Sequence, residues 1–354
     1  MSNRFLAFLT VTLLLAACGQ KDPPVAGAPA EAAAGDEDAV VNVYSSRHYD
    51  TDLRLYDDFT AATGIDVKLI EAGADELIER IRSEGEFSPA DLLITVDAGR
   101  LWRAEEAGVF APVRSALLEE RIPGYLQHPD GLWFGLSTRA RVIVYNRAAG
   151  EPAPLATYAD LANPAHQGKV CIRSSGNIYN ISLLASMISR QGPDAAEAWA
   201  RGVVANFARP PQSNDTGQIR AVASGECGIG VVNSYYLARL AASDDPAERE
   251  VANAVGVIFP NQSDSGTHVN VSGAGLVSTA PNRDNAIRFL EYLTSDAAQR
   301  YFADGNHEYP AVAGLPGSPE LAALGEFQPD TLDAAELGRH QAEAVKVFDR
   351  AGWR

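Results

Sequence analysis

Hydrophobic residues follow two different spacings along the chain after residue 40. Short apolar runs such as 40–44 and 92–96 alternate with segments like 50–62, in which apolar residues recur every three or four positions. The short runs are typical of buried strands, whereas the wider spacing places apolar residues on one face of a helix. This alternation predicts an α/β fold with parallel sheets that are covered by helices on both faces.

The pattern divides into two series of elements. The strands expected in the first series are 40–44, 65–69 and 92–96. Its helices are 50–62, a helix that carries Leu77, Ile78 and Ile81, and 98–107. The pattern changes at 133–146, where Val142, Val144 and Tyr145 continue a strand after a turn-rich stretch, and we expect the first crossing between lobes there. The second series then has strands at 169–172 and 228–232 and helices near 180–191, 194–206 and 215–224. A further helix is expected from Tyr235, with Ser234 as its N-cap.

The stretch 269–277 is expected to return to the first series, with Gly273 and Gly275 providing flexibility there. Helices at 283–294, 296–304 and 333–350 follow. Residues 40–354 are numerous enough for two lobes. We expect the first lobe to contain 40–136 plus about 272–310, and the second 137–271 plus about 311–354.

The beginning of the chain predicts export. Arg4 precedes an apolar run that ends at Cys18 in the sequence Leu-Ala-Ala-Cys. A charged start, a short apolar core and small residues before a cut describe a secretory signal, and the run is too short to span a bilayer comfortably. An uncleaved membrane anchor is the alternative. The pattern resembles the lipobox of bacterial lipoproteins, which implies a signal peptide at 1–17, lipidation of Cys18 and a lipid-anchored protein in the periplasm or cell envelope.

Residues 18–39 predict a disordered tether, because they are rich in Gly, Ala, Pro, Asp and Glu and contain only one large apolar residue, Val25.

The chain has 29 basic and 46 acidic side chains, a net charge of −17. This charge argues against nucleic acid as a partner and against direct adhesion to anionic lipid. Contact with the membrane is therefore expected through the lipid anchor only. Acidity is compatible with collecting cations, although it is also typical of ordinary solubility.

Two further cysteines, Cys171 and Cys227, each stand eight residues before a tyrosine, so that they could lie at similar heights on neighbouring strands. An exported protein can form disulfides. We expect these two residues to pair, with two buried free thiols as the alternative. The sequence has no Cys-x-x-Cys, and a thiolate metal site is not expected.

Candidate ligands for a metal ion follow three of the predicted strands. In open α/β sheets, ligands bind beyond the carboxyl ends of the strands, and these clusters come from both predicted lobes. The candidates are His48, Tyr49, Tyr179, Tyr235 and Tyr236. His48 could be a ligand, a donor to a ligand or a surface residue. Together these side chains form a hard, oxygen-rich set.

Tyr235 and Tyr236 can share one ion only if they begin a helix. Neighbouring side chains of a strand face opposite ways, whereas at a helix start they are about 100° apart and can converge. Arg239 would lie on the same face, where its charge could stabilise or orient a phenolate. The alternative is an aromatic pair that packs in the core beside a solvated arginine.

The cost of ionising tyrosine selects the ion. A tyrosine with a pKa near ~10 costs about 4 kcal/mol to ionise at pH 7, so that three phenolates cost roughly 12 kcal/mol. Divalent ions with softer preferences would take histidine, cysteine or carboxylate instead. A small trivalent cation, Fe(III), can supply this free energy. Ligation then releases protons, and affinity should weaken as the pH falls.

The segments 43–49, 171–180 and 232–239 resemble those of the ferric-ion-binding proteins of bacterial ABC importers, in the branch with a His-Tyr pair in its first loop. The similarity extends from Val40 to Trp353. It implies a type II periplasmic-binding-protein fold, in which two hinged α/β lobes close over the ligand. By this resemblance the five candidates match the iron ligands, and Arg239 matches a supporting arginine.

The resemblance also implies partners. They are Fe(III) as the transported ligand and an ABC permease with its ATPase subunit, and we expect a monomer. In the other branch of the family, an acidic ligand and a bound anion complete the coordination, and Tyr49 and Tyr179 suggest that no anion is needed here. The lipobox departs from family members that diffuse freely.

Two other classes of function compete with iron binding. A binding protein for a sugar, a polyamine or a thiamine-like cation would use the same scaffold, with aromatic residues stacking on the ligand. A secreted enzyme is not expected, because the sequence has no Gly-x-Ser-x-Gly, His-Glu-x-x-His or Walker-type phosphate loop. A charge-transfer colour with Fe(III) would separate the first class from iron binding.

Overall fold

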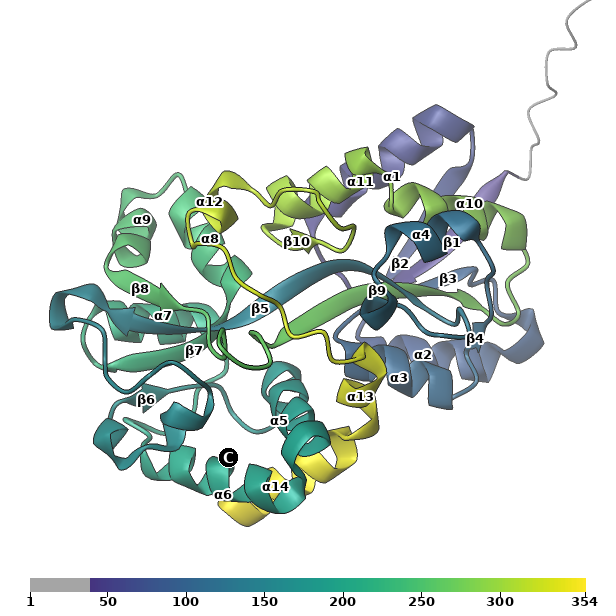
Figure 1. Cartoon of the computed structure of the whole chain (residues 1–354). Coiled ribbons are helices and arrows are strands. Elements are labelled where there is room, and N and C mark those ends of the chain that lie inside the picture. The colour runs from purple at the N-terminus through teal and green to yellow at the C-terminus, as the bar shows by residue number, and fades with distance from the viewer. Residues whose placement is uncertain (1–38) are drawn as a thin grey trace, which may run out of the picture. The chain divides into compact units, whose positions relative to one another are not determined.

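A mixed β-sheet runs through the protein in the computed structural model, which describes residues 39–354 (Figure 1). The strand order is β2-β1-β3-β9-β5-β7-β6. These strands are β1 (Val40–Ser45), β2 (Asp66–Glu71), β3 (Leu92–Val96), β5 (Phe134–Asn146), β6 (Val170–Cys171), β7 (Ile229–Asn233) and β9 (Val269–Val277). The short strands β4 (Phe110–Ala111), β8 (Val255–Ile258) and β10 (Tyr309–Pro310) pair with β9, β5 and β5. The predicted signal peptide, Cys18 and the tether up to residue 38 lie outside the described residues.

The sheet contains parallel pairs at its two ends and antiparallel pairs in its middle. Strand β1 is parallel to β2 and β3, and β6 is parallel to β7. The long strands β5 and β9 are antiparallel to each other, and they pair antiparallel with β7 and β3. The expectation of mostly parallel pairing therefore holds for the strand–helix repeats and not for β5 and β9, which connect them. Below, the β1 side means β1–β3 with their helices, and the β7 side means β6 and β7 with theirs.

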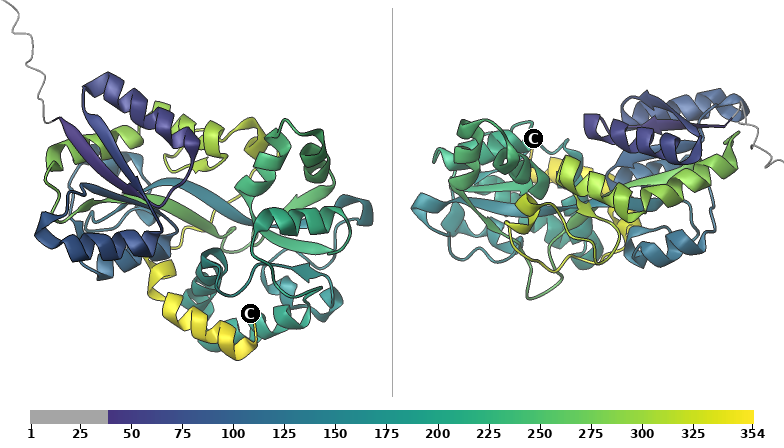
Figure 2. Two further views of the ribbon diagram at one scale, coloured as in Figure 1. Left: turned by 180° about the vertical axis from the view of Figure 1, so that it is seen from behind. Right: turned by 90° about the horizontal axis from the view of Figure 1, so that it is seen from above.

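Helices cover both faces of the sheet on each side (Figures 1 and 2). Those of the β1 side are α1 (Asp50–Thr63), α2 (Ala74–Glu84), α3 (Ala98–Glu106), α4 (Ala116–Arg121), α10 (Arg283–Leu293) and α11 (Asp296–Arg300). Those of the β7 side are α5 (Ile178–Gln191), α6 (Pro193–Ala205), α7 (Asp215–Ala223), α8 (Ser234–Ala242), α9 (Pro246–Asn253), α12 (Pro319–Ala322) and α14 (Gln341–Ala351). Helix α13 (Ala334–Arg339) contacts both α3 and α5, so that it packs on both sides.

Two of the expected helices differ in detail. The run 333–350 forms α13 and α14, which are separated at His340, where the backbone leaves helical geometry (φ −97°, ψ 2°). The helix expected at 296–304 continues from α11 as a π-helical turn, Tyr301–Gly305. Assignment of the chain segments to two lobes stays a prediction.

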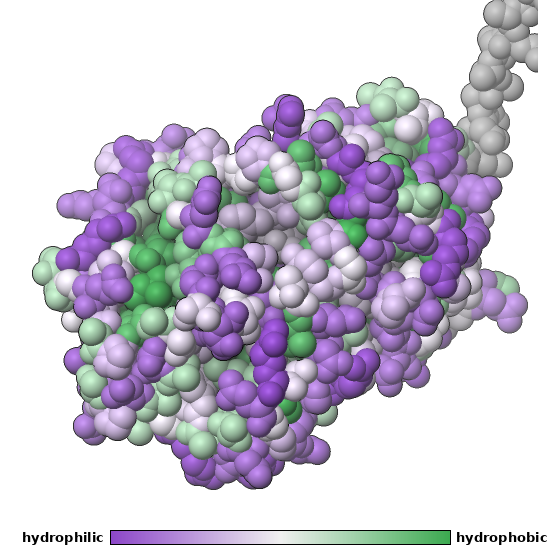
Figure 3. All heavy atoms as spheres, in the orientation of Figure 1, coloured by the Kyte–Doolittle hydropathy of each residue, from purple (hydrophilic) through white to green (hydrophobic). Residues whose placement is uncertain are grey.

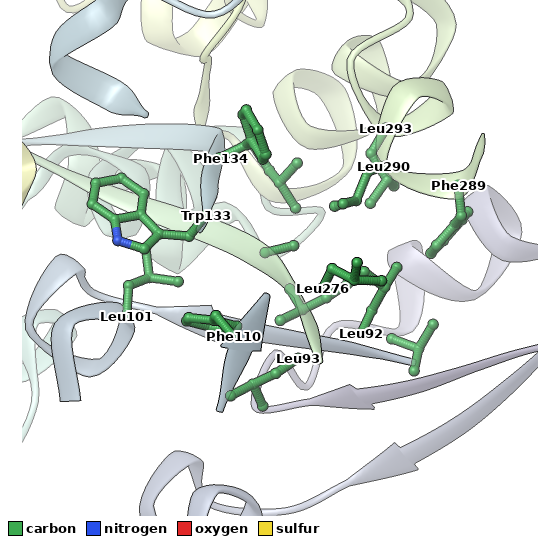
Figure 4. Packing of buried hydrophobic residues seen from close by; sticks show 14 of the residues in the cluster. Leu92, Leu93, Leu101, Phe110, Trp133, Phe134, Leu276, Phe289, Leu290 and Leu293 are labelled. Atoms are coloured by element: carbon green, nitrogen blue, oxygen red, sulfur yellow. The ribbon is translucent and has the colours of Figure 1, made fainter. Parts of the chain in front are cut away.

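The core follows the alternation of side chains along the strands. In β5, Val142 and Val144 belong to a buried cluster with residues of α7 and α8, whereas Ile143 belongs to a cluster with α5 and α6. On the β1 side, Leu92 and its register partner Leu276 pack with apolar residues of α10 (Figure 4). Each such buried leucine contributes about 1.5–3 kcal/mol, so both faces of the sheet hold their helices firmly.

Cys171 and Cys227 are joined by a disulfide, with their Cα atoms 6.0 Å apart. The bond links β6 to the residues just before β7 and joins two cysteines that are 56 positions apart in the sequence. A cross-link of this kind stabilises a fold mainly by restricting the unfolded chain. In the folded protein, the bond ties together the two strands that precede Tyr179 and Tyr235.

Charged and polar residues cover most of the face seen in Figure 3, and apolar residues gather mainly at its left. Within residues 39–354, none of the helices has the length and apolar character needed to cross a membrane.

Candidate metal centre

The three tyrosine-containing clusters meet in one cleft of about 350 Å³. Residues of the loop after β1 contribute from the β1 side, and the starts of α5 and α8 contribute from the β7 side. The lining includes all five candidate ligands and Arg239, namely His48, Tyr49, Tyr179, Tyr235, Tyr236 and Arg239. The structure thus brings together every site residue that the sequence predicted for metal binding.

Each candidate tyrosine lies at the beginning of a helix. Tyr49 is the residue before α1, Tyr179 is the second residue of α5, and Tyr235 and Tyr236 follow the first residue of α8. The expected N-cap at Ser234 is wrong by one residue, because the helix begins there and Asn233 occupies the N-cap position. None of the three N-caps makes a capping side-chain hydrogen bond. Helix starts carry free N–H groups and partial positive charge, and they favour anionic groups such as phenolates.

The tyrosine side chains are already close to one another. Tyr235 and Tyr236 stack with their ring centroids 4.2 Å apart, and the hydroxyl oxygens of Tyr179 and Tyr235 are 3.3 Å apart. The guanidinium of Arg239 lies 4.9 Å from the ring centroids of both Tyr49 and Tyr235. Arg239 therefore bridges tyrosines of the β1 side and the β7 side, as a supporting arginine would.

Burial keeps Tyr49, Tyr179 and Tyr235 neutral in the absence of a cation. It raises the pKa of Tyr179 to about 12 and the pKa of Tyr235 well above its usual value. Burial and the charge of Glu308 also raise the pKa of Tyr49. Only a highly charged cation could ionise several of these hydroxyls together at neutral pH.

Buried charges next to the tyrosines were not predicted from the sequence. Glu308 accepts hydrogen bonds from Arg47 (2.9 Å), Arg139 (2.7 Å) and Ser137 (2.7 Å). Arg47 also donates to Asp52 at 2.8 Å. Burial alone would raise the pKa of Glu308, but the two arginines lower it to about 2. The carboxylate is therefore ionised and holds both guanidinium groups in place.

Arg139 acts on the tyrosines through its charge. Its guanidinium opposes the effect of burial and lowers the pKa of Tyr49, Tyr179 and Tyr235. Its Nε and Nη1 atoms are buried without a hydrogen-bond partner among the described residues. Arg139 lies in the buried strand β5, and charged residues in buried strands are rare unless they are paired. The presence of an arginine within this buried strand could have identified Arg139 from the sequence.

A second arginine of β5, Arg141, fixes the starts of α5 and α8. It donates to Asp215 (2.8 Å), to Asn233 (3.1 Å) and to Asn180 (2.8 Å). Asn180 follows Tyr179 and Asn233 precedes α8, so this network positions three of the candidate tyrosines relative to the sheet.

His48 is the most exposed of the candidates, with a side chain that is 57% exposed. Its Nδ1 lies 3.8 Å from Glu71 Oε1. In the part of the chain that the structure describes, no group of three or more His, Cys, Asp or Glu side chains is placed to hold a metal ion. The donors available in this cleft are thus mainly phenolic.

Known proteins share this architecture and sequence. The profile of the family described as bacterial extracellular solute-binding protein matches residues 87–324. Iron uptake protein A1 of Synechocystis sp. is 53% identical over 342 residues, covering 96% of this chain and 93% of the relative. A structure of FutA (IdiA) from Trichodesmium in complex with iron and citrate is 55% identical, with a TM-score of 0.86, and covers 89% of this chain and all of the other. The ferric binding protein of Campylobacter jejuni, 38% identical, has a TM-score of 0.83 and covers 89% of this chain and 100% of the other.

These similarities identify the class of protein as a solute-binding protein, which is not an enzyme. Within that class, the chain belongs to the bacterial ferric-ion-binding proteins, in the branch that contains the iron uptake proteins of Synechocystis and FutA of Trichodesmium. The resemblance and the periplasmic-binding-protein fold inferred from the sequence are confirmed. The description of the family as extracellular agrees with the expected export, and the lipid anchor stays a prediction.

Proposed function

We propose that the protein is the binding component of an ABC importer that captures Fe(III) and delivers it to a permease with its ATPase subunit. The phenolates of Tyr49, Tyr179, Tyr235 and Tyr236 would be the ligands, with His48 as a further one at the exposed rim. The observation that carries this proposal is the meeting of four tyrosines from three helix starts in one cleft. The iron-bound structure of the Trichodesmium relative supports it.

Capture would proceed in two stages. The β7 side presents Tyr179, Tyr235 and Tyr236 together, so the larger part of the ligand set binds first. Closure of the cleft then adds Tyr49 and His48 from the β1 side and excludes water. Arg239, which contacts rings of both sides, would stabilise the closed arrangement. Release would need reopening, protonation or reduction, because Fe(II) gains less from phenolates than Fe(III).

We also propose the cellular setting that the sequence predicts. Cleavage of the signal peptide at residue 17 and lipidation of Cys18 would place the monomeric protein at a membrane surface, with residues 19–39 as a tether. The folded body could then reach a permease without diffusing away.

Addition of Fe(III) to the purified protein should produce a visible phenolate-to-iron charge-transfer band and one bound iron per chain. Tyr179→Phe should lower the absorbance and weaken binding, because it removes one phenolate and keeps the ring. Tyr292→Phe is the matched control, since Tyr292 lies outside the cleft and packs on Phe59 with ring centroids 5.2 Å apart. A colourless protein without iron by elemental analysis would reject the proposal and favour a small organic ligand.

Iron binding should release protons, and affinity should fall as the pH is lowered. The pKa values of Tyr49, Tyr179 and Tyr235 are raised above their usual range, that of Tyr179 to about 12, so that these hydroxyls are protonated in the iron-free protein at neutral pH. For each phenolate that forms on binding, the affinity for Fe(III) should fall about tenfold when the pH is lowered by one unit.

The measurement is the number of protons released when a ferric chelate is added to unbuffered protein, with the chelate alone as the blank. Tyr179→Phe should release one proton fewer than the wild type. Equal release from the two proteins would contradict the assignment of Tyr179.

A further inference from the structure

We propose that Asp97 and Ser182 form the contact that positions Tyr179 relative to the ligands of the β1 side, and that this contact slows release of the metal ion. The inference depends on the proposed function, because it concerns how the iron ligands are brought together. Both residues are buried and neither lines the cleft. Asp97 and Ser182 are therefore positioning residues and not ligands.

Ser182 lies one helical turn after Tyr179 on α5, on the β7 side. Asp97 follows β3 on the β1 side. The hydroxyl of Ser182 donates to Asp97, with distances of 3.0 Å to Oδ1 and 2.8 Å to Oδ2. The hydrogen bond therefore connects the helix that carries Tyr179 directly to the opposite side of the cleft.

Asp97 is held by several elements besides α5. Its carboxylate accepts hydrogen bonds from the Gly99 backbone (2.8 Å), from Asn270 of β9 (2.6 Å) and from Gln341 of α14 (3.3 Å). Its own N–H donates to the Val271 carbonyl at 2.9 Å. The carboxylate is thus fixed to the long connecting strand β9, and motion of α5 relative to the β1 side must change the Asp97–Ser182 contact.

The backbone of Asp97 has an unusual conformation. Its φ is +90°, a region that residues other than glycine rarely adopt and that a surrounding network must hold. Burial raises the pKa of Asp97, and the hydrogen bonds from Ser182 and Gly99 oppose that rise. A buried carboxylate that is satisfied mainly by neutral donors is sensitive to the loss of any one of them.

The test compares Ser182→Ala with Ser186→Ala in the iron-loaded protein. Ser186 lies one turn further along α5, is also buried, and donates to the Leu183 carbonyl of the same helix at 2.7 Å. Ser182→Ala should release iron to a competing chelator about tenfold faster than the wild type, since hydrogen bonds to charged groups are strong. Ser186→Ala should stay within about twofold of the wild type, because it removes a hydroxyl without touching the β1 side. Asp97→Asn, which keeps the shape and loses the charge, should also accelerate release.

A second comparison separates positioning from general destabilisation. If Ser182 acts through Tyr179, Ser182→Ala should accelerate release little further in a Tyr179→Phe background. Equal release rates for Ser182→Ala and Ser186→Ala, or additive effects of Ser182→Ala and Tyr179→Phe, would overturn the inference. Failure of the wild type to bind iron would instead reject the proposed function, so the two failures can be told apart.

Discussion

The double variant Tyr235→Phe, Tyr236→Phe is expected to lose at least about a thousandfold in affinity for Fe(III), because loss of groups that only orient a ligand already costs about 10–100-fold. Both hydroxyls are removed from one helix start while the rings remain. The two rings stack on each other, and phenylalanine preserves that contact. The affinity should therefore fall without loss of the fold. It can be measured by competition with a chelator, and the fold by thermal unfolding.

Tyr292→Phe serves again as the control, because it makes the same chemical change outside the cleft. It should bind iron as the wild type does. If the double variant keeps the affinity of the wild type, Tyr235 and Tyr236 are not ligands. The cleft would then have to hold its cation through Tyr49, Tyr179 and His48 alone.

The sequence predicted the residues that line the cleft better than the buried polar residues around them. Tyrosines that follow predicted strands could be placed at one edge of the sheet, because the strand ends of an α/β fold converge there. Likewise, the need for Tyr235 and Tyr236 to converge required a helix start, and α8 begins at Ser234. These inferences needed only the local spacing of hydrophobic residues and the direction of the chain.

The buried polar network could not be predicted in the same way. Arg47 and Glu308 are separated by most of the sequence, and only the folded chain shows that they pair at 2.9 Å. The antiparallel pairing of β5 with β9 is equally non-local, because no short connection links the two strands. The contact of Asp97 with Ser182 depends on how α5 packs across the sheet, which a periodic pattern does not specify.

Replacement of Arg139 by methionine is expected to lower the free energy of unfolding by about 3–5 kcal/mol, the usual cost of removing one partner of a buried ion pair. Arg139 and Glu308 are both buried, and Arg139 Nη2 donates to Glu308 Oε1 at 2.7 Å. Iron binding should also weaken, because Tyr49, Tyr179 and Tyr235 would lose a nearby positive charge. Chemical denaturation of the iron-free protein measures the first effect, and chelator competition measures the second.

Two further variants show whether the loss comes from the broken pair. Arg201→Met removes an arginine that pairs with Glu197 at the surface of α6, and it should cost no more than about 1 kcal/mol. Arg139→Met combined with Glu308→Gln should be more stable than Arg139→Met alone, because it also removes the carboxylate that lost a partner while Arg47 keeps Asp52. An Arg139→Met protein as stable as Arg201→Met would show that the charge of Arg139 is dispensable for the fold. The stability of the site would then have to come from the packing of the tyrosine rings and from the network around Arg141.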